Sequence, residues 1–213
     1  MGGPAMRIRN TIILTVAATL AAAAGPTTAG TSVARNIVGT NGADHLVGTS
    51  GHDRIRGLAG DDRLEARGGR DRIEAGRGDD RLRGGRGDDI LLGRSGDDTM
   101  WGAKGFGNAG DMMFGFRGAD TAYGGPGRDF FNAGAGADTF YGGRGIDDGS
   151  LGNGRDFANL GSGNDYLEGL TRDGVRDRVK CGNGHDAITY LDHRDRKDDL
   201  TGCEDVTVVV IID

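Results

Sequence analysis

Bulky apolar residues recur along most of the chain at intervals of nine, and most of them have polar or glycine neighbours. A single apolar side chain between outward-pointing neighbours is typical of a short β-strand with one buried face. The pattern therefore predicts a succession of short strands, each directing one side chain into a shared core. The apolar positions are Leu46, Ile55, Leu64, Ile73, Leu82, Leu91, Met100, Met113, Phe131, Phe140, Leu167, Val179 and Ile188.

Aspartate and glycine follow the same period. An aspartate stands two residues before each apolar position, and a glycine stands two residues before almost every aspartate. Three residue types in phase argue against a low-complexity linker, although the chain contains 43 glycines. Only four of the 32 acidic residues are glutamates, and the short aspartate side chain suits a cation held at a backbone turn. The phased aspartates are Asp44, Asp53, Asp62, Asp71, Asp80, Asp89, Asp98, Asp111, Asp120, Asp129, Asp138, Asp147, Asp156 and Asp165, followed by Asp177 and Asp186.

One of these repeats, Gly84–Leu92, reads GGRGDDILL and resembles the calcium-binding nonapeptide of the RTX (repeats-in-toxin, haemolysin-type) family, G-G-x-G-x-D-x-U-x. The resemblance covers about residues 36–190. It implies an all-β fold, a right-handed parallel β-roll or β-solenoid, that binds several Ca²⁺ ions. It also implies that one aspartate and the aspartate 18 residues further on hold an ion between them. The expected metal ligands are the phased aspartates from Asp44 to Asp165.

Two nonapeptides should make one coil, so that residues 18 apart stack at the strand spacing of about 4.8 Å, in about six or seven coils. The core would hold one apolar side chain per half-coil, too little to offset the ordering entropy of so many glycines. Calcium is the expected compensation, because this cation takes six or more oxygen ligands. Without metal, the rows of aspartates repel one another, and we expect a disordered chain.

The repeat is interrupted at two places. Four extra residues between Asp98 and Asp111, around Trp101–Phe106, predict a loop that bulges from one coil and weakens the ion site there. After Asp165 the register slips by three residues, which predicts that the β-roll ends near Leu170. The expected organisation is a signal peptide at 1–29, a lead-in at 30–39, the β-roll at 40–170 and a C-terminal cap at 171–213.

The N-terminus has the features of a secretory signal. Arg7 and Arg9 precede an apolar run from 11 to 24, and small residues that suit cleavage after Ala24 or Ala29 follow. The run is short for a membrane span of about 20 residues. We therefore expect a secreted, extracellular protein, with attachment to the cell surface left open and no membrane insertion after signal removal. In that compartment Cys181 and Cys203 should form a disulfide that staples the cap.

No catalytic or nucleotide-binding motif stands out, and the histidines share no metal-ligand spacing, so we expect no enzyme and no nucleic-acid partner. Two outward surfaces suggest other partners. Arginines crowd residues 54–94 and could bind cell-wall polymers or another polyanion, or only form solubilising salt bridges. Trp101, Tyr123 and Tyr141 should stack on one face, as a sugar platform or as a self-stabilising cross-strand ladder.

The expected function is calcium binding by a secreted β-roll that folds on Ca²⁺ binding and has a structural or adhesive role. A non-catalytic glycan- or polyanion-binding module is the alternative. A polysaccharide-modifying enzyme is a distant third.

Overall fold

The computed structural model describes residues 33–103, 110–170, 173–191 and 198–209. These residues belong to one compact unit, 31–213, which is all β-structure. The strands are β1 (Asn36–Val38), β2 (His45–Val47), β3 (Arg54–Ala59), β4 (Arg63–Gly68), β5 (Arg72–Arg77), β6 (Arg81–Arg86), β7 (Ile90–Ser95), β8 (Thr99–Ala103), β9 (Met112–Arg117), β10 (Thr121–Gly127), β11 (Phe130–Ala135), β12 (Thr139–Gly145), β13 (Asp148–Ser150), β14 (Phe157–Ser162), β15 (Tyr166–Leu170), β16 (Arg178–Asn183), β17 (Ala187–Leu191), β18 (Asp199–Thr201) and β19 (Asp205–Val209).

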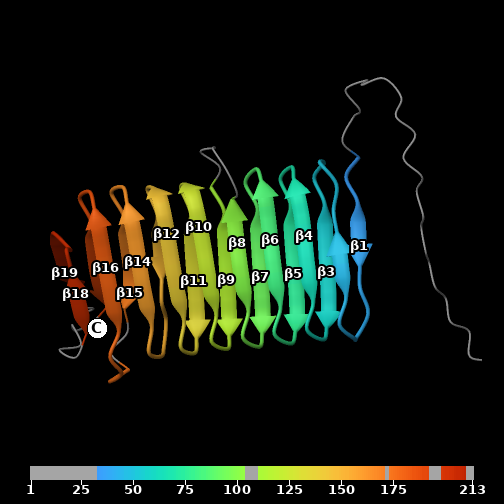
Figure 1. The fold of residues 1–213 in the computed structure, drawn as a ribbon. Coiled ribbons are helices and arrows are strands. Elements are labelled where there is room, and N and C mark those ends of the chain that lie inside the picture. The colour runs from blue at the N-terminus through green and yellow to red at the C-terminus, as the bar shows by residue number, and fades with distance from the viewer. Residues whose placement is uncertain (1–32, 104–109, 171–172, 192–197, 210–213) are drawn as a thin grey trace, which may run out of the picture. The chain divides into compact units, whose positions relative to one another are not determined.

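Successive strands alternate between two parallel sheets. The odd-numbered strands form one sheet of ten and the even-numbered strands form the other sheet of nine, each in chain order. Figure 1 shows the chain running up one sheet and down the other, so that two strands and two turns make one coil. Below, the two sheets are called the odd sheet and the even sheet. The expected parallel β-solenoid of nonapeptide repeats is confirmed.

Stacking follows the predicted offset of 18 residues, as in the pairing of Ile55 with Ile73. The offset becomes 22 where Leu91 pairs with Met113, and 21 where Ala158 pairs with Val179. Most extra residues are thus placed in the turns, and the strands keep their register, except for a shift between Leu167 and Leu170 where β15 pairs with β17. Trp101, which we had grouped with the extra residues, lies within β8, and residues 104–109 are outside the described part of the chain.

Two expectations about the length of the solenoid are wrong. The structure has about nine coils instead of six or seven. Neither sheet ends near Leu170, because β16 and β18 continue the even sheet and β17 and β19 continue the odd sheet. The three-residue slip after Asp165 lengthens a turn without ending the solenoid. The last strands of both sheets therefore come from the segment that we had assigned to a cap.

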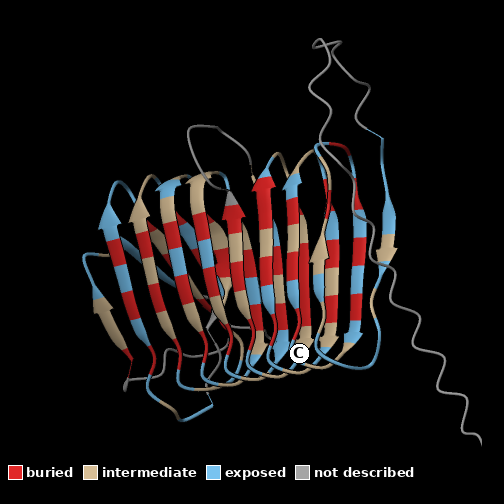
Figure 2. Ribbon diagram, turned by 45° about the vertical axis from the view of Figure 1, so that its right-hand side comes forward, coloured by how far each residue is buried: buried red, intermediate tan, exposed pale blue. Residues whose placement is uncertain are grey.

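The core is a narrow space between the sheets. Figure 2 shows buried residues alternating with intermediate or exposed ones along the strands. The residue two positions after each aspartate is inward, as predicted, and Leu64, Leu82 and Phe131 are each 0% exposed. A second inward rank, two residues further along, was not predicted. It contains Ala66, Ala75, Ala133, Leu151, Leu160, Cys181 and Tyr190.

Large side chains fill the core where an inward residue is small. The inward position after Asp147 is Gly149, and a Cβ there would lie 3.8 Å from a ring carbon of Phe140 and 3.2 Å from a methyl carbon of Leu167. Phe131 and Phe140 stack across the core with their ring centroids 5.3 Å apart. Aromatic packing therefore compensates for the missing side chain.

The predicted disulfide between Cys181 and Cys203 is confirmed. It joins β16 to the turn between β18 and β19, and thereby ties the last coils together. The expected signal peptide at 1–29 lies outside the described residues. Within the described residues, no helix is long and apolar enough to cross a membrane.

Candidate metal centre: two columns of buried aspartates

The phased aspartates lie immediately before the strands, where each turn enters a sheet. Because the coils stack in register, the aspartates form two columns along the solenoid, one at the entry to each sheet. Except for Asp44, which is partly buried, each of the aspartates expected as ligands is at most 2% exposed. The odd column contains Asp53, Asp71, Asp89, Asp111, Asp129, Asp147 and Asp165, and the even column contains Asp44, Asp62, Asp80, Asp98, Asp120, Asp138 and Asp156.

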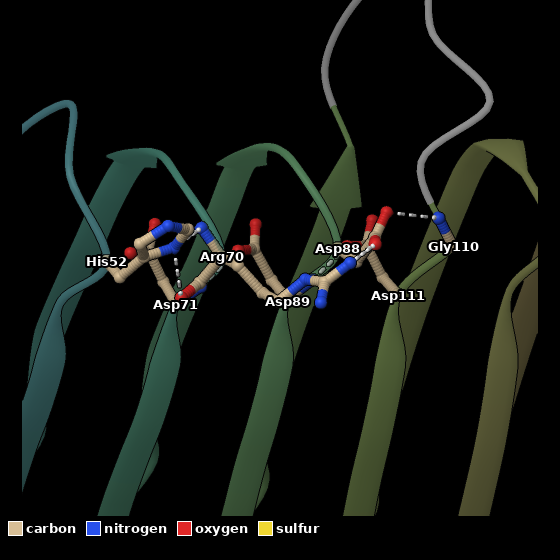
Figure 3. Close-up of polar contacts among 7 residues, drawn as sticks. All are labelled: His52, Arg70, Asp71, Asp88, Asp89, Gly110 and Asp111. Atoms are coloured by element: carbon tan, nitrogen blue, oxygen red, sulfur yellow. Dashed lines mark hydrogen bonds and ion pairs between the residues drawn. The ribbon is translucent and has the colours of Figure 1, made fainter.

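Within each column, one carboxylate oxygen has a hydrogen-bond partner in the preceding coil. The backbone N–H of Asp71 donates to Oδ1 of Asp89 at 2.8 Å, and the N–H of Asp89 donates to Oδ1 of Asp111 at the same distance. Figure 3 shows these three aspartates in successive turns. The even column repeats the arrangement, as in the 2.9 Å bond from Asp80 N–H to Oδ1 of Asp98. Each column is thus a continuous ladder that links one coil to the next.

The second carboxylate oxygen, Oδ2, is buried without a hydrogen-bond partner. This holds for every column aspartate from Asp62 to Asp165, in both columns, and also for Asp186. In part of each column, glycine five residues earlier leaves room for this oxygen, whereas alanine or leucine stands there elsewhere, as in Ala66 before Asp71 and Leu160 before Asp165. A Cβ on Gly124, for example, would lie 2.5 Å from Oδ2 of Asp129 and 2.7 Å from the carbonyl oxygen of Gly142. A carboxylate oxygen and a backbone carbonyl oxygen therefore approach the same glycine, with no side chain between them.

Burial raises the pKa of the column carboxyl groups from Asp62 to Asp165 because it removes water from the charged form. The pKa of Asp98 rises to about 8, and those of Asp89 and Asp147 rise to about 7. Hydrogen bonds from the backbone lower the pKa only partly, and neighbouring aspartates of the same column raise it further. To be fully charged at neutral pH, the columns need positive charge close to them.

Basic side chains do not supply that charge. Among the described residues, no arginine, lysine or histidine forms an ion pair with a column aspartate from Asp44 to Asp165. A hard divalent cation would supply it, since Ca²⁺ prefers carboxylate and carbonyl oxygens. In the described part of the chain, no three His, Cys, Asp or Glu side chains converge as a metal site. A bound cation would therefore take one or two carboxylates from a column and its other oxygens from backbone carbonyls or water.

The fit to calcium thus rests on unpartnered oxygen atoms. The column aspartates would hold the ions, and the ions would neutralise the buried charge between successive coils. The proposed pairing of each aspartate with the one 18 residues on has a structural counterpart, because these two residues are neighbours in a column. Their direct contact runs from a backbone N–H to a carboxylate.

The columns extend further than the sequence analysis expected. Asp98 N–H donates to Oδ1 of Asp120 across the four extra residues, so the insertion does not break the even column. Beyond Asp165, the ladder continues through residues 21 apart, with Asp156 N–H donating to Asp177 and Asp177 N–H to Asp198. In the odd column, Asp186 N–H donates to the carboxylate of Glu204. Asp177 and Asp186 were recognised as phased but were not expected as ligands, whereas Asp198 and Glu204 were missed. The spacing of 21 could have identified Asp198, and the spacing of 18 could have identified Glu204.

The tandem acids form a separate, exposed row beside the even column. Asp79 N–H donates to Oδ1 of Asp61, and Asp97 N–H donates to Oδ1 of Asp79. Beside the odd column, the equivalent positions hold His52, Arg70 and Asp88, which Figure 3 also shows. Arg70 N–H donates to His52 Nδ1, and the Arg70 guanidinium pairs with Asp88 at 2.6 Å. These side chains therefore have structural partners on the outside of the turns.

A comparison with protein families agrees with this geometry. The RTX calcium-binding nonapeptide repeat (4 copies) matches residues 38–73, 65–100, 74–108, 114–148 and 150–171, which together are more than half of the chain. A comparison with curated proteins gave no match. No toxin or protease domain is indicated. The nine-residue period, the buried aspartate columns and the family match lead to one conclusion: the chain belongs to the RTX calcium-binding nonapeptide repeat family.

Proposed function

We propose that this protein is an extracellular β-solenoid whose folding is driven by Ca²⁺ held along the two aspartate columns. The observation that carries the proposal is the repeated buried Oδ2 atom without a hydrogen-bond partner. A buried polar atom without a partner destabilises a fold by about 1–3 kcal/mol, and by more when it is charged. A cation that binds only the coiled form would remove that cost at each coil and favour folding by mass action.

Extracellular conditions suit such a protein. Proteins with these repeats are typically secreted. Millimolar extracellular Ca²⁺ matches the weak sites of extracellular modules. The disulfide in the last coils is of a kind that persists in oxidising compartments. The signal peptide at 1–29 and a structural or adhesive role are parts of this proposal, as is the absence of catalysis, which is typical of the repeat family.

Circular dichroism in the far ultraviolet tests the proposal on residues 30–213. The chain should change cooperatively from coil to β-structure during a Ca²⁺ titration and should not respond to Mg²⁺, which demands a smaller and more regular oxygen shell. A chain that is already β-rich after complete removal of calcium at about pH 9, above the raised pKa values of the columns, would contradict calcium-driven folding.

The geometry of the aromatic row favours self-stacking over a sugar platform. Trp101 and Tyr123 are almost parallel, with ring centroids 5.8 Å apart, and Tyr123 and Tyr141 stack at 5.0 Å. The Arg83 guanidinium lies over the Trp101 ring at 5.4 Å. A sugar that stacks on an aromatic ring needs a free ring face, and neighbouring side chains cover these faces. The cross-strand ladder is therefore the better interpretation of the row.

A polyanion-binding role remains as the second candidate function. It is favoured by arginines in the first coils that have no carboxylate partner.

A further inference from the structure

Three arginines gather on the outer face of the odd sheet near its N-terminal end. Arg54 in β3 is directly opposite Arg72 in β5, and Arg56 lies two residues along β3 on the same face. All three side chains are exposed. Residues opposite each other on adjacent strands are within side-chain reach, and like charges there destabilise a sheet.

No carboxylate neutralises this group. Glu74 is in register with Arg56, but its carboxylate pairs with Arg94 at 2.8 Å. Among the described residues, Arg54, Arg56 and Arg72 form no ion pair. The column aspartates of these coils are buried in the turns and would be neutralised by calcium. The folded and calcium-loaded solenoid would therefore present a net positive charge here.

The surface at this point is hollow. A shallow depression is lined by Arg54, Arg56 and Arg72, together with Asn36, Ile55 and Glu74. Arginine presents donors in a planar fork that binds carboxylate and phosphate groups through two parallel hydrogen bonds. A depression with three such forks at its wall suits an oxyanion.

The arginine group is confined to the first coils of this face. At the positions of Arg54 and Arg72, the next strands of the odd sheet carry Ile90, Met112 and Phe130. On the even sheet, Arg63 is likewise opposite Arg81, but Arg63 pairs with Glu65 on its own strand, and Arg83 lies over Trp101. On the odd sheet, these positions thus hold arginine only in β3 and β5 and apolar residues in the next three strands.

We infer that this arginine depression binds oxyanion groups repeated along an acidic polymer. The inference rests on the proposed function, because the arginines come together only when the chain is coiled. Guanidinium groups on neighbouring strands are separated by about one strand spacing, about 4.8 Å. Such a row can contact several groups of one extended polymer, so that weak single contacts add up to useful affinity. Carboxylates of a polyuronate and phosphates of a polyphosphate share the required chemistry.

The test compares two double variants with the same change in net charge. Arg54→Gln/Arg72→Gln removes two arginines of the depression, and Arg144→Gln/Arg155→Gln removes two exposed arginines from later coils. Binding to polygalacturonate and to long-chain polyphosphate is measured by co-sedimentation or light scattering in millimolar Ca²⁺, with neutral dextran as the control. Any calcium held by the polymer affects both variants alike.

The depression variant should lose about tenfold in affinity, equivalent to about 1.4 kcal/mol, whereas the control variant should change by less than about twofold. A loss on only one of the two polymers identifies that polymer as the source of the oxyanions. Equal loss in both variants, binding to dextran, or binding that persists without calcium would overturn the site. Stronger binding to anionic lipid vesicles than to either polymer would also overturn it.

Circular dichroism of the same samples separates this inference from the proposed function. A wild-type chain that stays unfolded in Ca²⁺ contradicts calcium-driven folding. A chain that folds in Ca²⁺ but shows no difference between the two variants contradicts only the arginine site.

Discussion

Protons should replace calcium in this fold, because the same buried carboxylates need either a cation or a proton. Without metal, a column aspartate in the folded chain has a raised pKa, and in the unfolded chain it has a pKa of about 3.9. Its contribution to stability is therefore fully present below about pH 4 and is lost as the pH rises through the folded-state pKa. For the column aspartates from Asp80 to Asp165, that value is about 6 to 8.

The magnitude is large because the effect is repeated. One unit of pKa corresponds to about 1.4 kcal/mol. Counting only one unit for each of the ten aspartates with a pKa of about 6 to 8 gives on the order of 14 kcal/mol. A typical domain has an unfolding free energy of about 5–15 kcal/mol. Metal-free solenoid should therefore not survive above about pH 8.

The assay is far-ultraviolet circular dichroism between pH 4 and pH 9, on protein from which calcium has been removed by resin. The metal-free chain should be β-rich in mild acid and unfold as the pH rises through about 6 to 8. With millimolar Ca²⁺, the β-structure should persist to the upper end of this range. Metal-free protein that keeps its β-structure at pH 9 would refute the reasoning, as would a metal-free chain with no change over the whole range.

Further substitutions test the columns, the glycines and the disulfide. Asp98→Asn keeps a hydrogen-bond acceptor but removes a buried charge, so it should raise the Ca²⁺ midpoint of folding several-fold and make the metal-free protein easier to fold. The control, Asp97→Asn on the exposed row, should have neither effect. Equal effects of the two variants would show that only the number of charges matters. Gly145→Ala places a Cβ against the backbone carbonyl oxygen of Gly127 at a φ of +134° and should lower the unfolding free energy by about 1–3 kcal/mol, whereas Gly68→Ala, whose nearest neighbour is 3.6 Å away, should be almost neutral in a denaturant titration. Reduction of the disulfide should lower the unfolding free energy in Ca²⁺ by about 3 kcal/mol. Amide hydrogen exchange should then be faster in β16–β19 than in β3–β6. Uniform exchange along the solenoid would contradict a local role of the disulfide in the last coils.

The period of the sequence was enough to predict the coil, because one aspartate and one apolar residue per nine determine both turn and strand. It also identified the column members from Asp44 to Asp165. It failed where the spacing between aspartates changed from 18 to 21, since three extra residues in a turn look like the end of a repeat but leave strands such as β16 in register. The continuity of the even column past Asp98 was missed for the same reason.

Other features could not be read from single positions. The second inward rank contains glycine, alanine and larger residues, such as Gly124, Ala66 and Leu160, and so has no constant residue type. Which carboxylate oxygen accepts a hydrogen bond and which stays without a partner depends on the position of the backbone N–H in the neighbouring coil. Arg54, Arg56 and Arg72 lack a carboxylate partner because Glu74 pairs with Arg94 and not with Arg56, and only the side-chain geometry reveals this.

The most direct test of the central claim is a crystal structure of the chain grown in Ca²⁺, with anomalous scattering used to locate the metal. We predict metal ions along both columns, each in contact with a buried aspartate Oδ2 that has no hydrogen-bond partner within the protein. Ions found only on the exposed row of Asp61, Asp79 and Asp97, or no ions beside the buried aspartates, would contradict the account.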